Sequence, residues 1–93
     1  MEFEWDDDKS DACFRGRGFD FDYAIRVFSD RNRVVMPDRR RDYGEDRYRV
    51  FGMIDGRVYV VVYTMREAMF RIISARKANV KETEDYGHNA RQD

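Results

Sequence analysis

Arginine is the residue type in this sequence that most clearly points to a role in binding or catalysis. Residues 31–81 carry 13 basic and 6 acidic side chains, a net charge of +7, whereas the flanking segments 1–30 and 82–93 carry −5 and −3. Only three of the 18 basic residues are lysines. The planar arginine fork suits bidentate contact with phosphate or carboxylate. The basic segment therefore indicates a polyanionic ligand or an acidic partner, or else a solvated face paired with the acidic flanks.

Several other chemistries lack the residues that they need. Cys13 is the single cysteine and His88 the single histidine, which argues against an internal disulfide, a structural zinc site and a two-histidine acid–base mechanism. Ser74 has no accompanying base in a recognisable pattern. The start of the chain is acidic, unlike a signal peptide, and no apolar run approaches the roughly 18 residues of a membrane span. We therefore expect no metal or cofactor, no membrane association and a cytoplasmic location.

The N-terminal third predicts one short strand and two helices. Phe3–Trp5 alternates apolar and acidic residues, as an edge strand does. Asp7–Arg17 begins with acids that suit a helix N-terminus and is followed by Gly18, which favours a helix end. Asp20 can cap a second helix over Phe21–Ser29, whose apolar residues recur at helical spacing and should face the core.

The strongest local pattern is a β-hairpin in the middle of the chain. Arg47–Ile54 and Arg57–Thr64 are rich in β-branched and aromatic residues. They flank Asp55-Gly56, a pair that readily takes the positive φ angles of a type I′ turn. The segment 38–45 before the hairpin is charged and is expected to form a loop.

The remaining elements complete a small α+β domain. A strand over residues 34–36 should end at Pro37, which has no amide hydrogen to donate. Met69–Ser74 should form a further strand, and Asn79–Tyr86 a last helix. The prediction is an antiparallel β-sheet of about four strands with two N-terminal helices and one C-terminal helix. Residues 1–88 are expected to form one domain, and residues 89–93 a frayed tail.

The hairpin register assigns side chains to two faces of the sheet. A two-residue turn places Ile54 opposite Arg57, Val50 opposite Val61 and Tyr48 opposite Tyr63. One face is then apolar and suited to covering helices: Tyr48, Val50, Gly52, Ile54, Tyr59, Val61, Tyr63, Phe70 and Ile72. The opposite face, here named the arginine face, mixes apolar residues with arginines: Arg47, Arg49, Phe51, Met53, Val58, Val60, Val62, Thr64, Arg71 and Ile73.

Two interpretations of the arginine face stay open on these grounds. Arginines among hydrophobic neighbours are well placed to hold a phosphate backbone, and Phe51 or Tyr43 could stack on a splayed base. Alternatively, this face packs on the N-terminal helices, with its arginines paired to acids such as Asp7 or Asp11. The two interpretations carry equal weight.

Four stretches, in order and across nearly the whole chain, carry a more specific signal. They are Phe3-Glu4-Trp5-Asp6; Pro37-Asp38-Arg39 through Asp42-Tyr43-Gly44-Glu45 and Arg47; Asp55-Gly56-Arg57 with Val60-Val61-Val62-Tyr63-Thr64; and Arg71-Ile72-Ile73-Ser74-Ala75-Arg76-Lys77-Ala78 with Glu82 and Tyr86. Together these stretches resemble the BrnT family of toxins. One departure stands out: the family often has Lys-His-Gly where this chain has Gly16-Arg17-Gly18, and Arg17 cannot replace a histidine as a base.

The resemblance implies a fold, an activity and a partner. The fold would be RelE-like, and the activity would be that of a type II toxin, a ribonuclease that cleaves messenger RNA and inhibits translation. A BrnA-like antitoxin would neutralise it, and a heterotetramer formed through paired antitoxins would fit the family.

Cleavage of RNA without a metal needs a proton acceptor for the 2′-hydroxyl, stabilisation of charge on the phosphate and a proton donor for the leaving oxygen. For phosphate binding and charge stabilisation we assign Arg47, Arg71 and Arg76. Glu45 is the leading base, and Tyr63 the leading proton donor. Further RNA contacts are assigned to Arg49, Arg66 and Lys77.

Each assignment has a plainer alternative. Glu45 would otherwise be a solvated loop carboxylate, Tyr63 a core tyrosine and Arg76 the partner of Glu82. Two other functions also fit the sequence: a non-catalytic inhibitor that uses the same scaffold against a protein such as a topoisomerase, and a nucleic-acid-binding module without catalysis.

Overall fold

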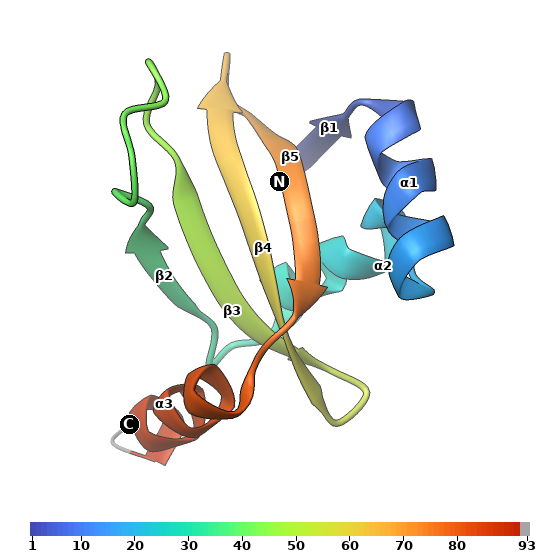
Figure 1. The fold of residues 1–93 in the computed structure, drawn as a ribbon. Coiled ribbons are helices and arrows are strands. Elements are labelled where there is room, and N and C mark those ends of the chain that lie inside the picture. The colour runs from blue at the N-terminus through green and yellow to red at the C-terminus, as the bar shows by residue number, and fades with distance from the viewer. Residues whose placement is uncertain (92–93) are drawn as a thin grey trace.

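The structure, a computed structural model, describes residues 1–91 and is an α+β domain, as the sequence predicts. Within this range one sheet has the strand order β1-β5-β4-β3-β2 (Figure 1). The strands are β1 (Glu2–Trp5), β2 (Val34–Pro37), β3 (Tyr48–Ile54), β4 (Arg57–Arg66) and β5 (Met69–Lys77). The helices are α1 (Asp7–Arg17), α2 (Phe21–Ala24), a 3-10 helix η1 (Ile25–Ser29) and α3 (Val80–Arg91). Residues 89–91 of the expected tail belong to α3, and residues 92–93 lie outside the described range.

The sheet has five strands and is mixed, which corrects the expectation of about four antiparallel strands. The N-terminal segment does form an edge strand, but β1 runs parallel to β5, with Glu2 opposite Met69 and Trp5 opposite Ile72. The other three pairings are antiparallel. A parallel pairing between segments so distant in the chain leaves no local trace in the sequence.

The central hairpin has the predicted register. Tyr48 lies opposite Tyr63, and Ile54 lies opposite Arg57. Asp55 and Gly56 form the turn, with φ angles of 50° and 82°. Because Asp tolerates the left-handed region and Gly prefers it, the turn type and hence the register follow from this pair of residues.

The connection between β4 and β5 is tighter than expected, and β5 is longer. Glu67 and Ala68 form the turn at positive φ, where the sequence predicts a connection over residues 65–68 and a strand ending at Ser74. A β-bulge between Val62 and Tyr63 shifts the register. Side chains alternate along a strand, so this shift brings Ser74 and Arg76 onto the arginine face.

The N-terminal helices follow their capping residues. The Asp6 carboxylate accepts from the Asp8 amide at 2.9 Å, and Gly18 ends α1 at a φ of 86°. Asp20 caps α2 by accepting from the Tyr23 amide at 2.9 Å. The single helix expected over residues 21–29 is instead one α-helical turn that continues as the 3-10 helix η1.

The two faces of the sheet pack differently. The predicted apolar face carries the larger core, in which Val50, Val61 and Ile72 pack with residues of α1, α2 and η1. The N-terminal helices therefore do not cover the arginine face, and the packing alternative for that face is wrong. Instead, α3 lies at one end of the sheet (Figure 1). Tyr86 of α3 and Ala78 belong to a smaller core there, together with Phe51, Val58 and Val60.

Candidate functional site

A hollow of about 160 Å³ lies on the arginine face between β3, β4 and β5. We name it the arginine cavity. Its floor is formed by Val60 and Val62, and four arginines from different parts of the chain converge on it. The full lining is Arg17, Arg40, Arg49, Val60, Val62, Ser74, Ala75 and Arg76. Strand register explains the central part, because Arg49 and Ser74 both lie opposite Val62.

Two of these arginines are held by carboxylates. The Arg76 guanidinium donates to both Glu82 oxygens at 2.7 and 2.8 Å, which is the alternative pairing that the sequence suggested. This contact holds the pKa of Glu82 down at about 2. The Arg40 guanidinium likewise donates to both oxygens of the buried Asp38 carboxylate, at 2.7 and 2.8 Å, and lowers the pKa of Asp38 to about 2. Both acids are therefore charged at neutral pH and are poor proton acceptors.

The other two arginines have no carboxylate partner among the described residues. Arg17 Nη1 donates to the Ala75 carbonyl oxygen at 3.1 Å. The Nε atom of Arg49 is buried and has no hydrogen-bond partner within residues 1–91. A buried donor without a partner costs free energy, and a bound anion would satisfy it. With four arginines and two carboxylates, the cavity carries an excess of positive charge suited to phosphate.

A second hollow, of about 470 Å³, lies beside the loop between β2 and β3. We name it the loop hollow; it is lined by residues 37–39, 41–43 and 45–48. Glu45 accepts from Arg47 Nε at 3.1 Å and lies 3.7 Å from Arg66 Nη2. The Arg47 guanidinium lies 4.1 Å from the centre of the Tyr43 ring. The Asp38–Arg40 ion pair joins this hollow to the arginine cavity, because Asp38 lines one and Arg40 the other.

The structure therefore brings the sequence-predicted residues together in two groups. Arg49 and Arg76 line the cavity, and Glu45, Arg47 and Arg66 meet at the loop. Arg71 lies apart, because it pairs with Glu4 of β1 at 2.7 Å.

Tyr63 and Lys77 belong to the other side of the sheet. Tyr63 is buried among the aromatic rings of the helix-side core, where burial raises its pKa. Lys77 lies opposite Tyr59, which belongs to the same core. Tyr63 is thus the core tyrosine of the plainer alternative, and the sheet itself separates it from the arginine cavity.

Sequence reasoning missed Arg17 and Arg40, which line the cavity, and Asp38, which pairs with Arg40. Arg17 was noted only as a departure from the family pattern, and the structure places it at the end of α1, against β5. Arg40 and Asp38 were assigned to an undifferentiated charged loop. The Asp38-x-Arg40 spacing is the one local signal that could have indicated this pair.

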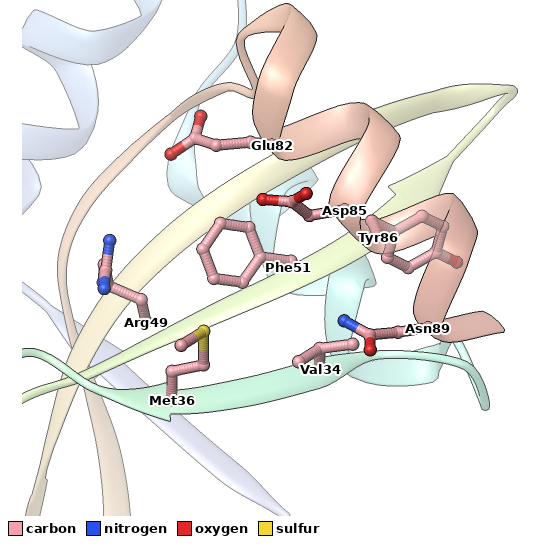
Figure 2. Close-up of a pocket in the computed structure, with 8 residues that line it drawn as sticks. All are labelled: Val34, Met36, Arg49, Phe51, Glu82, Asp85, Tyr86 and Asn89. Carbon is pink, nitrogen blue, oxygen red and sulfur yellow. The ribbon is translucent and has the colours of Figure 1, made fainter. Parts of the chain in front are cut away.

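A third hollow, of about 190 Å³, lies between β2, β3 and α3 (Figure 2). We name it the apolar groove. Arg49 lines both this groove and the arginine cavity. The full lining of the groove is Val34, Met36, Arg49, Phe51, Glu82, Asp85, Tyr86 and Asn89.

Neither a metal centre nor a membrane span was found in the described part of the chain. Residues 1–91 contain no group of three or more His, Cys, Asp or Glu side chains placed to hold a metal ion. No helix in this range is long and apolar enough to cross a membrane.

The model of a family described as "Ribonuclease toxin, BrnT, of type II toxin-antitoxin system" matches residues 5–82. No curated protein matches the chain. The matched segment includes the cavity and loop residues described above, from Arg17 of α1 to Glu82 of α3.

Proposed function

Because the chain belongs to the BrnT family of ribonuclease toxins of type II toxin–antitoxin systems, we propose that it cleaves messenger RNA at the arginine cavity. Family membership makes RNA the target and an antitoxin the partner. The observation that carries the choice of site is the convergence of Arg17, Arg40, Arg49 and Arg76 on one hollow. The finer proposal is that cleavage needs no metal, inhibits translation and occurs in the cytoplasm.

The arginine cavity would hold the scissile phosphate. Arg17 and Arg49 supply donors that form no ion pair with a carboxylate of the described residues, whereas Arg76 is oriented by Glu82. When the 2′-hydroxyl attacks the adjacent phosphorus, negative charge grows on the phosphate oxygens, and arginine donors already in place stabilise it without reorganisation. Ser74 at the edge of the cavity is small enough to leave this space open.

The proton-transfer groups would come from the loop hollow. Asp38 and Glu82, with pKa values held at about 2, are weak bases, so Glu45 is the better candidate for taking the proton of the 2′-hydroxyl. Tyr43 replaces Tyr63 as the candidate proton donor, because its hydroxyl lies 3.4 Å from Asp38 Oδ2 on the rim of the same hollow.

Cleavage of a labelled RNA in EDTA tests this proposal. Arg49→Gln should slow cutting about a hundredfold, the usual cost of removing one preorganised donor to a developing charge. Glu45→Gln should lower kcat with RNA binding retained. Arg26→Gln is the matched control, because Arg26 pairs with Asp55 on the exposed turn and does not line the cavity. Intact RNA with folded wild-type protein would refute the proposal, and unchanged cutting by Arg49→Gln would refute the site.

We also propose that the antitoxin is BrnA-like and that the complex is a heterotetramer. Exposed apolar side chains support a protein partner near the edge strand β2, where Val35 and Met36 are 47% and 45% exposed. Co-expression with the antitoxin and measurement of the mass of the complex tests this. A complex of one toxin with one antitoxin would contradict the heterotetramer.

A further inference from the structure

The apolar groove and the arginine cavity adjoin at Arg49, which lines both. A nucleotide whose phosphate lies in the cavity would therefore have its base directed toward the groove. The volume of the groove, about 190 Å³, is well below the roughly 300–1,000 Å³ of pockets for drug-sized molecules. It is suited to one planar ring system.

The lining of the groove is suited to stacking of a nucleobase, because it contains an aromatic ring and apolar side chains. Phe51 forms its centre and is only 8% exposed, so its ring is fixed by its neighbours. Val34, the register partner of Phe51, and Met36 lie beside it on the neighbouring strand β2, and α3 borders the other side of the groove (Figure 2). A base that lies in the groove exchanges water for an aromatic surface and a polarizable thioether, a mode of binding that every nucleobase can use.

One side of the groove is polar. Asp85 and Asn89 are four residues apart on α3, so they lie on the same face of the helix. In Figure 2 the Asp85 carboxylate lies over the Phe51 ring, with Arg49 and Asn89 toward opposite ends of the groove. The other acid of the groove, Glu82, has both oxygens engaged by Arg76. Asp85 is therefore the carboxylate that can contact a bound base.

The contact that Asp85 makes within the protein is weak. Its Oδ2 atom accepts from Lys81 Nζ at 3.3 Å, and both side chains are mostly exposed, at 63% and 83%. Exposed ion pairs of this kind contribute little and exchange readily with solvent. A ligand with better-placed N–H donors can replace this contact.

We propose that the apolar groove is a base-recognition subsite that selects guanine in the RNA. This inference rests on the proposed function, because it places the phosphate of the same nucleotide in the arginine cavity. A carboxylate only accepts hydrogen bonds, and guanine presents two adjacent donors, N1–H and N2–H, that fit its two oxygens. The Asn89 amide can donate to O6. Adenine and cytosine present a ring nitrogen acceptor beside their amino group, which would face the Asp85 charge.

Titration of the full chain with GMP, AMP, CMP and UMP, followed by NMR, tests the proposal without requiring cleavage. GMP should bind about tenfold more tightly than the other three, the lower end of what a bidentate contact contributes. Asp85→Asn should abolish this preference by weakening GMP binding, and it should strengthen AMP binding, because the charge that faces the adenine ring nitrogen is removed. Glu84→Gln is the matched control, since Glu84 lies on the same helix but lines a different hollow. Phe51→Leu should weaken all four nucleotides alike.

Equal affinities for the four nucleotides, or GMP selectivity that survives in Asp85→Asn, would overturn the proposal. The test also separates it from the ribonuclease activity. Selective GMP binding by a chain that leaves RNA intact would support the subsite and refute the proposed function. Cleavage without any preference for guanine, with equal nucleotide affinities, would refute the subsite alone.

Discussion

Glu82→Gln removes the negative charge of a carboxylate of α3 that accepts three hydrogen bonds. Besides the two bonds from Arg76, Glu82 Oε1 accepts from the Asn79 amide at 2.9 Å, and the Asn79 side chain accepts from the Glu82 amide at 2.8 Å. This reciprocal arrangement caps the helix at the point where the chain leaves β5. Glutamine keeps the size of the side chain and the bond to Asn79, so the variant isolates the ion pair with Arg76.

The magnitude follows from the pKa of Glu82. A difference between the ordinary value of 4.5 and about 2 would correspond to about 3 kcal/mol if the pair were shielded from water. Arg76 is 36% exposed, so solvent screening reduces the contribution to about 1 kcal/mol. The folded-state pKa is lowered. This stability is therefore present above pH 4.5 and is lost as the pH falls toward 2.

Urea unfolding of wild type and Glu82→Gln, followed by circular dichroism across this pH range, measures the effect. The free energy of unfolding should differ by about 1 kcal/mol at pH 7, and the two proteins should converge near pH 2. Glu84→Gln, on the same helix, should match wild type throughout. A difference that is absent at pH 7, or that persists unchanged at pH 2, would refute the assignment of this ion pair.

Three further outcomes are expected. Gly52→Ala should lower the free energy of unfolding by about 1–3 kcal/mol, because a Cβ there would lie 2.7 Å from the Val27 carbonyl oxygen. Gly16→Ala should not destabilise the protein, because there is open space around Gly16. Thermal unfolding of both variants tests this difference. Arg49→Gln should reduce the salt dependence of RNA binding by about 0.7 in the log–log slope, measured by fluorescence anisotropy, and an unchanged slope would place Arg49 away from the phosphates. Cys13 is buried, which raises its pKa, so a thiol reagent should label it only on unfolding, and rapid labelling of the folded chain would contradict this.

Sequence reasoning succeeded where short-range chemistry sets the geometry. Asp55-Gly56 fixes the hairpin register, and Asp6 and Gly18 bound α1. Sequence reasoning failed where contacts between distant parts of the chain set the geometry. The bulge at Val62/Tyr63 has no marker such as glycine or proline, yet it determines which face Arg76 occupies.

The candidate site shows the same division. The sequence indicated an arginine-rich face, and Arg49 and Arg76 do line its cavity. It could not indicate that Arg17 would reach the Ala75 carbonyl, 58 residues along the chain. The sequence pattern also could not decide whether Tyr63 is a core residue or a proton donor. Alternation along the strand assigns Tyr63 to the helix-covered face, whereas its hydroxyl could donate a proton.

The parallel pairing of β1 with β5 affects the order in which the molecule can fold. The Glu4–Arg71 ion pair that joins these strands spans 67 residues. Since β1 leaves the ribosome well before β5, it must wait for its partner, and closing so long a loop is slow. Arg17 lies on α1, which follows β1, and contacts β5, so the arginine cavity cannot assemble on a nascent chain that lacks β5. The cavity proposed to bind RNA is therefore complete only after synthesis has passed β5.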